Sequence, residues 1–199
     1  MAPPLASDSS DSPTPPDVFI DKNAGLDYWQ SVGADVDSML GGVPSAGGFS
    51  SVSRIDLIGS RSFLARLGIG IKGDRCKVAS ALEGGAGIGR ITQGLLVDIA
   101  EQVDVVEPIA KFTQKLVGRP GVRHIHNIGL QDWEPAEGLR YDLIWVQWCL
   151  GHLTDLQLVA FLRRCQGALS PEGGVLVVKE NLSSSGLDVY DETDSSVTR

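Results

Sequence analysis

The stretch that decides the fold reads LEGGAGIGR and spans residues 82–90. It places Glu83, Gly85, Gly87 and Gly89 at alternate positions, between an apolar segment and a helical pattern. Glycines allow a tight turn and the close approach of a ligand, and the start of the following helix offers free N–H groups. The stretch therefore predicts a ligand-binding turn between a strand and a helix.

The chain around this turn alternates between strand and helix patterns. The predicted strands are 77–83, 103–107, 123–127, 141–148 and 174–181, and the predicted helices are 88–99, 108–117 and 155–169. Pro108 is expected at the first position of its helix. Such alternation indicates an α/β protein with a mainly parallel sheet and helices on both faces. No strand is expected after residue 181.

The N-terminal part has a different character. Residues 1–18 are rich in Pro, Ser and Asp and are expected to be disordered. A helix is expected from Asp21, and after a glycine-rich loop a second one over 53–67, with Ser53 as its N-cap. The expected apolar face of the second helix consists of Ile55, Ile58, Leu64 and Leu67.

The totals fit a soluble single domain, because 42% of the 199 residues are hydrophobic and 21% are charged. A net charge of -8 argues against a nucleic-acid partner and permits a cationic one. Cys76, Cys149 and Cys165 are widely spaced, which predicts neither a disulfide framework nor a zinc site and favours a reducing compartment. Because no signal peptide or membrane span can be identified, we expect a cytoplasmic protein, with nuclear entry left open.

Glu107 ends the strand that follows the glycine stretch, 18 residues beyond Gly89. An acid there can accept hydrogen bonds from both ribose hydroxyls of an adenosine. The pattern E-x-G-x-G-x-G departs from the dinucleotide fingerprint G-x-G-x-x-G. It resembles the first motif of the Rossmann-like, class I S-adenosylmethionine-dependent methyltransferases, and an acid at Glu83 suits a cationic sulfonium. NAD remains the alternative cofactor.

More of the chain carries a closer resemblance. DYWQSV, VDSMLGG, GAGIGRIT, GLQDW, YDLIWVQWCLGHLTD, FLRRCQGALSPEG, VVKEN and DETDSSV occur in this order between residues 27 and 197. Together they resemble the eukaryotic alpha N-terminal protein methyltransferases, the N-terminal Xaa-Pro-Lys family. The resemblance implies S-adenosylmethionine as cofactor and methylation of the alpha-amine of proteins that begin Ala/Pro/Ser-Pro-Lys, or with Arg in third place, after Met removal.

The same resemblance implies roles for individual residues. The implied cofactor-binding residues are Gly85, Arg90, Glu107, Pro108, Ile109, Leu130, Gln131 and Gln147. The implied substrate-binding residues are Tyr28, Trp29, Trp148, Asn181, Asp191, Asp194 and Ser196. His152 and Asp194 are the candidate acceptors for the proton of the substrate ammonium. No metal is expected, and the protein is expected to be a monomer.

The acidic stretch GLDVYDETDSS, residues 186–196, has two interpretations. From composition it is a solvated tail. From the resemblance it is half of a binding site for a cationic peptide end. Three parts are expected: a helical substrate-side extension (19–70), a cofactor-binding core (76–182) and this acidic segment (183–199).

The chain departs from the family pattern in two places. Gly84 stands where the family has Cys, and the antiparallel hairpin that ends a full methyltransferase sheet cannot be identified, so the domain reads as C-terminally truncated. Two alternatives therefore stay open. The chain could be an inactive cofactor-binding paralogue or fragment, or a small-molecule methyltransferase of the same fold.

Overall fold

The computed structural model describes residues 14–41, 49–70 and 77–199, with side chains described from residue 52 onward in the second range. Residues 1–13, for which disorder is expected, lie outside these ranges. So do most of the glycine-rich loop and Cys76. Within the described ranges, the strands form a five-stranded parallel sheet in the order β3-β2-β1-β4-β5 and a two-stranded antiparallel sheet, β6-β7. The strands are β1 (Val78–Gly84), β2 (Ala100–Val106), β3 (Val122–His126), β4 (Leu143–Gln147), β5 (Val175–Lys179), β6 (Val189–Asp191) and β7 (Ser196–Thr198).

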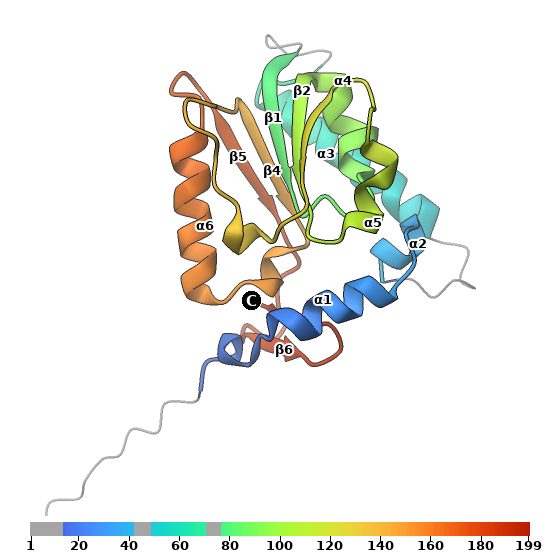
Figure 1. Ribbon diagram of the computed structural model, residues 1–199, viewed down its shortest axis with the longest axis vertical. Helices are drawn as coiled ribbons and strands as arrows, with labels where there is room; N and C mark the ends of the chain where they lie inside the picture. The colour runs from blue at the N-terminus through green and yellow to red at the C-terminus, as the bar shows by residue number, and fades with distance from the viewer. Residues whose placement is uncertain (1–13, 42–48, 71–76) are drawn as a thin grey trace, which may run out of the picture.

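Helices cover both faces of the parallel sheet (Figure 1). The α-helices are α1 (Lys22–Ser31), α2 (Val36–Met39), α3 (Phe49–Arg66), α4 (Val97–Ile99), α5 (Ala110–Thr113) and α6 (Asp155–Ala168). The shorter turns are η1 (Pro16–Phe19), η2 (Thr92–Leu96, a π-helix), η3 (Gln114–Leu116), η4 (Leu130–Asp132) and η5 (Leu150–His152). No helix in the described ranges is long and apolar enough to cross a membrane.

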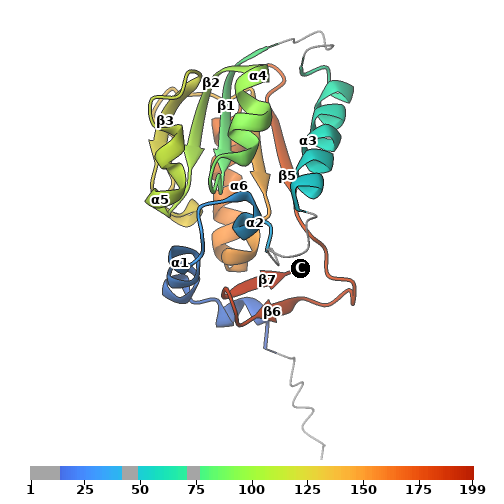
Figure 2. The ribbon, with the colours of Figure 1, turned by 90° about the vertical axis from the view of Figure 1, so that its right-hand side faces the viewer.

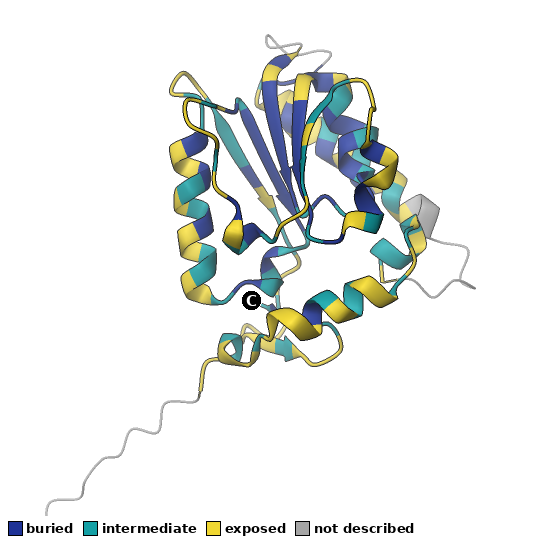
Figure 3. Ribbon diagram, in the orientation of Figure 1, coloured by how far each residue is buried: buried dark blue, intermediate teal, exposed yellow. Residues whose placement is uncertain are grey.

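The sheet separates two apolar clusters. Leu64 of α3 and Leu95 of η2 pack on one face, and Phe161 and Cys165 of α6 pack on the other. The central strands are buried on both sides (Figure 3), which explains their nearly continuous apolar sequences. Chain order reverses between β1 and β4, and ligands of open α/β sheets bind at such a switch point, outside the carboxyl ends of the strands.

A second layer lies across these carboxyl ends: α1 and the β6–β7 hairpin run beneath the sheet (Figures 1 and 2). The expectation of no strand after residue 181 is therefore wrong, and the acidic stretch is a folded hairpin rather than a tail. The expected disorder of residues 14–18 is also wrong, because Pro16–Phe19 forms a 3-10 turn. Phe19 contacts Tyr190 with ring centroids 5.8 Å apart, and Asp21 N donates to Ser195 Oγ over 2.7 Å.

Two helix predictions also need correction. Helix α3 begins at Phe49, not after Ser53, and Ile55 and Ile58 are exposed. Leu67 is exposed as well, so of the expected apolar face only Leu64 is confirmed as buried. Asp56 and Ser60 share the buried face with Leu64. The helix after β2 begins at Ala110 rather than at Pro108, because Glu107 accepts the amide of Ile109 and holds that residue extended.

Candidate functional site

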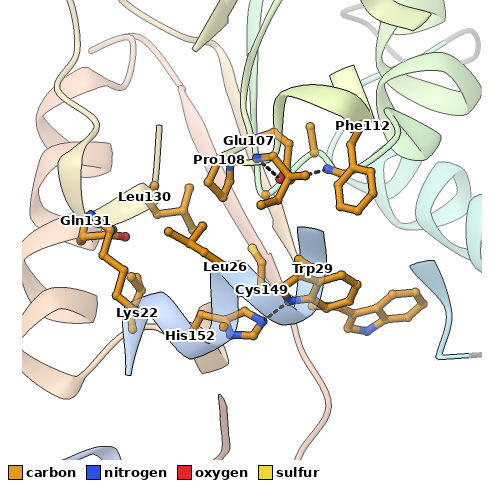
Figure 4. Close-up of a pocket in the computed structure, with 18 of the residues that line it drawn as sticks. Lys22, Leu26, Trp29, Glu107, Pro108, Phe112, Leu130, Gln131, Cys149 and His152 are labelled. Carbon is orange, nitrogen blue, oxygen red and sulfur yellow. Dashed lines mark hydrogen bonds between the residues drawn. The ribbon is translucent and has the colours of Figure 1, made fainter. Parts of the chain in front are cut away.

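The main pocket lies between the carboxyl ends of the parallel strands and helix α1 (Figure 4). Trp148, Cys149 and His152 line it after β4, and α1 adds Leu26 and Trp29. The pocket brings together all eight residues expected at the cofactor: Gly85, Arg90, Glu107, Pro108, Ile109, Leu130, Gln131 and Gln147. Its position is the one that the chain reversal between β1 and β4 predicts.

The glycine loop follows β1 and turns tightly beneath the sheet. Gly85 N and Ala86 N donate to Val106 O over 2.9 and 3.1 Å, and Gly85 has a φ of +68°. A Cβ at Gly85 would lie 2.4 Å from the Sγ of Cys149, closer than real atoms approach. Only glycine fits both this backbone conformation and this contact.

Glu107 is held by the loop that it faces. Its Oε2 accepts from Gly87 N over 2.8 Å and its Oε1 from Ile109 N over 2.9 Å. Burial raises the pKa of this carboxyl, and the two amide hydrogen bonds oppose the rise. Each oxygen of a carboxylate has two acceptor positions, so both oxygens can take a further donor such as a ribose hydroxyl.

Glu83 is buried at the end of β1 and accepts a hydrogen bond from Thr92 Oγ1. Burial raises its pKa to about 8, although the Thr92 bonds lower it. A carboxyl with this pKa is mostly protonated at neutral pH. The expected attraction between its charge and a sulfonium therefore stays a prediction.

Turn η4 places Leu130 and Gln131 in the pocket lining, and Leu130 packs in the apolar cluster beneath α6. Arg164 of α6 donates through Nη2 to the carbonyls of these two residues over 3.0 and 3.1 Å. These bonds fix the η4 backbone from α6. The neighbouring Arg163 is exposed.

His152 lies in η5, between α1 and the hairpin. Trp29 Nε1 donates to His152 Nε2 over 3.0 Å, and Asp194 Oδ2 lies 3.9 Å from the same nitrogen. Asp194 also accepts from Ser196 Oγ over 2.6 Å. Burial lowers the pKa of His152, while Asp194 and the backbone of Ser195 raise it. Because the effect of burial is the larger one, the pKa lies below its ordinary value of 6.5 and the imidazole is neutral at pH 7.

The expected substrate residues fall into two groups. Trp29 and Trp148 line the pocket, as does His152, the candidate proton acceptor. Five other described residues, Tyr28, Asn181, Asp191, Asp194 and Ser196, are not part of its lining. Of these, Asp194 and Ser196 stand behind His152, and Tyr28 packs edge-on against Trp29 with centroids 5.1 Å apart. Asn181 and Asp191 are exposed near the same end of the molecule.

Trp148 has an uncommon backbone and two cationic neighbours. Its φ of +56° is rare for a bulky residue, which makes it a candidate functional position. Arg90 lies 5.2 Å and Lys179 5.9 Å from the centre of its ring. Both cations bond Asp56 of α3, which the sequence analysis did not select. The sequence offers one signal for Asp56, which is a polar residue within a helix whose buried face was predicted from apolar residues alone.

The strand order, the glycine turn and the acid after β2 define a Rossmann-like fold with a pocket suited to a nucleoside cofactor. A solved S-adenosylmethionine-dependent methyltransferase of Leishmania major superposes with a TM-score of 0.74 at 36% identity, covering 89% of this chain and 67% of its own. The family model described as AdoMet dependent proline di-methyltransferase matches residues 18–199, and the chain belongs to this family.

Two curated relatives agree with the family assignment. Alpha N-terminal protein methyltransferase 1 of Schizosaccharomyces pombe is 46% identical over 178 residues, covering 87% of this chain and 76% of the relative. N-terminal Xaa-Pro-Lys N-methyltransferase 1 of Danio rerio is 44% identical over 180 residues, covering 86% and 75%. These matches confirm the expected fold class, a methyltransferase activity and S-adenosylmethionine as cofactor. They favour the enzyme over the inactive paralogue.

Proposed function

We propose that this enzyme methylates the alpha-amine of proteins with an exposed N-terminal Ala/Pro/Ser-Pro-Lys sequence. The observation that carries this proposal is the shared pocket. The glycine loop and Glu107 form one wall, and the Trp29–His152 pair forms the facing wall (Figure 4). A cofactor held on the first wall lies within reach of an amine held on the second. The names of the relatives from S. pombe and D. rerio point to the same substrate.

The described residues fit S-adenosylmethionine in three places. Gly85 leaves room for close backbone approach, and Arg90 offers a planar guanidinium suited to the cofactor carboxylate, with Gln147 beside it. Glu107 holds the ribose, next to Pro108 and Ile109. Leu130 and Gln131 flank the adenine. When bound, the cofactor supplies an electrophilic methyl group on a sulfonium.

The opposite wall suits the first two residues of the peptide. Trp148 gives a flat aromatic surface for proline, whose fixed φ lowers the entropy lost on binding. Asp194, behind His152, attracts the terminal ammonium by its charge, and the exposed Asp191 pairs with the lysine side chain. Asn181 and Ser196 add hydrogen bonds to the peptide backbone, while Tyr28 and Trp29 on α1 close the channel.

The amine must lose a proton before it can react. A free alpha-amine has a pKa of about 7.7–8.0, so most of it is charged at pH 7. His152 is neutral and its Nε2 accepts the Trp29 N–H, so this nitrogen can take a proton once Trp29 releases it. Asp194 then stabilises the imidazolium from 3.9 Å. His152 is thus the proton acceptor, and Asp194 orients the amine.

We also propose a cytoplasmic location, with nuclear entry left open, and a monomeric state. The free thiols of Cys149 and Cys165 support a reducing environment. Light scattering of the purified chain tests the monomer, and fractionation of cells that express it tests the location.

Mass spectrometry of the reaction with S-adenosylmethionine tests the function. The substrate is an Ala-Pro-Lys peptide, and the control is the same peptide acetylated at its N-terminus. Added methyl groups on the free peptide alone support the proposal. Methylation of the acetylated peptide places the reaction on lysine and overturns it. Transfer to small amines but to neither peptide supports the small-molecule alternative.

A further inference from the structure

Asp56 forms the centre of a buried polar cluster beside the pocket. Its side chain is 5% exposed, and its Oδ2 lies 2.6 Å from Arg90 Nη1. Gln147 Nε2 donates to both carboxylate oxygens, over 3.0 and 3.1 Å. Lys179 Nζ bonds Oδ1 and also lies 3.1 Å from Ser60 Oγ, one helical turn further along α3. The cluster joins α3 to the helical turn after the glycine loop and to the ends of β4 and β5.

Two of these partners, Arg90 and Gln147, line the cofactor pocket. They lie 34 and 91 residues from Asp56 in the sequence, so α3 reaches the pocket only through tertiary contact. A guanidinium and an amide on long side chains have many rotamers, and holding them in one geometry lowers the entropy lost when a ligand binds. Asp56 supplies that restraint to both groups at once.

The charges in the cluster also favour an anionic ligand. Among the described side chains, Arg90 and Lys179 both pair with Asp56, so these three groups keep one net positive charge. Burial opposes the ionisation of Asp56, but bonds from Lys179, Arg90 and Gln147 outweigh it and lower its pKa. The carboxylate therefore stays charged, and it separates two cations that would otherwise repel each other.

We propose that Asp56 is a positioning residue that orients Arg90 and Gln147 for the carboxylate of S-adenosylmethionine. This inference rests on the proposed assignment of Arg90 to that carboxylate. Asp56 is not itself part of the pocket lining, so it acts through its two partners that are. The alternative is that Asp56 only anchors α3. In that case a change at Asp56 affects ligands with and without a carboxylate equally.

Calorimetry with two ligands separates these roles. S-Adenosylhomocysteine carries the carboxylate, and its decarboxylated analogue S-adenosyl-3-thiopropylamine keeps the rest of the molecule. The wild-type chain should prefer S-adenosylhomocysteine. Asp56→Asn should weaken that ligand at least tenfold and change the affinity for the analogue by less than twofold. Ser60→Ala is the matched control, because it removes a bond to Lys179 from the same buried helix face and should keep the wild-type preference.

The outcomes distinguish the inference from the assignment beneath it. A wild-type chain that binds both ligands equally shows that Arg90 does not hold the carboxylate. The role of Asp56 is overturned if wild type prefers S-adenosylhomocysteine and Asp56→Asn keeps that preference. It is also overturned if Asp56→Asn binds S-adenosylhomocysteine more tightly than wild type. Equal loss for both ligands reduces Asp56 to an anchor of α3. If circular dichroism shows Asp56→Asn unfolded, Asp56→Glu keeps the charge but displaces it, and the same selective loss is expected.

Discussion

Trp29 Nε1 donates a hydrogen bond to His152 Nε2 over 3.0 Å, which joins helix α1 to the turn after β4. The bond occupies the lone pair that a proton acceptor needs. It also favours the neutral imidazole, since a donor directed at a ring nitrogen opposes its protonation. Helix α1 therefore both lines the pocket and favours the neutral form of His152, the proposed proton acceptor.

Trp29→Phe keeps an aromatic ring beside Phe112 and removes the donor. We expect the pKa of His152 to rise toward its ordinary value, because the neutral form loses a stabilising bond. The acid limb of the kcat/KM profile should then move to higher pH. Asp194→Asn should have the opposite effect, because Asp194 raises the pKa of His152. Titration of the imidazole signals by NMR measures both shifts, and an unchanged pKa in both variants would show that Trp29 and Asp194 do not control His152.

Gly85→Ala tests the contact between the glycine loop and Cys149. The new Cβ would lie 2.4 Å from Sγ and 2.5 Å from Cβ of Cys149, and it would be strained at a φ of +68°. We expect a loss of about 1–3 kcal/mol in stability and at least tenfold in affinity for S-adenosylhomocysteine. Gly118→Ala is the control, because it has a φ of +71° but its Cβ meets open space. Cofactor affinity in this control should stay within twofold of wild type; similar losses in both variants would contradict a role for the contact.

Arg164→Ala tests the support of the adenine side. It removes two hydrogen bonds to the carbonyls of Leu130 and Gln131, each worth about 1 kcal/mol. We expect the affinity for S-adenosylhomocysteine to fall about three- to tenfold in calorimetry. Arg163→Ala removes the neighbouring exposed arginine and should leave that affinity unchanged. If the two variants behave alike, the effect comes from the charge of α6 rather than from η4.

Asp191→Asn tests recognition of the third substrate residue. Asp191 is exposed on β6, so its pairing with a peptide lysine is worth at most about 1 kcal/mol, or roughly fivefold in affinity. Fluorescence binding should show that loss for an Ala-Pro-Lys peptide but not for Ala-Pro-Gln, with cofactor affinity unchanged. Glu192→Gln next to it is the charge-matched control. Equal weakening of both peptides would place the lysine elsewhere.

The sequence was informative where local rules govern structure. Alternating strand and helix patterns predicted the parallel sheet, and the glycine turn with Glu107 predicted the end at which the pocket lies. Prediction from sequence failed where the burial of a residue depends on partners far away along the chain. Asp56 is buried only because Arg90, Gln147 and Lys179 meet it, and no periodicity of α3 reveals such partners.

The hairpin was missed for a related reason. Strands β6 and β7 are three residues each, and acidic or hydroxyl side chains surround them, so they carry little apolar alternation. Their order comes from contacts with the N-terminal segment, such as Asp21 N to Ser195 Oγ. A segment stabilised mainly by a distant one looks disordered when it is read alone.

Glu83→Gln tests the buried acid of the glycine loop through the pH dependence of stability. The pKa is raised from 4.5 to about 8 on folding, so the stabilising contribution is fully present below pH 4.5 and is lost as pH rises to about 8. Across this range the free energy of unfolding of wild type should fall relative to Glu83→Gln by about 1.4 kcal/mol per pH unit. The glutamine resembles the protonated acid and can still accept the bond from Thr92.

Urea unfolding of both proteins at pH 5.5, 6.5 and 7.5 measures this difference, in which the titration of all other groups cancels. Glu101→Gln, an exposed position on β2, is the control and should alter stability by less than about 0.5 kcal/mol. A difference between wild type and Glu83→Gln that stays constant over the three pH values would mean that Glu83 is already ionised in the folded chain. The anionic partner for the sulfonium, first expected from the sequence, would then be supported.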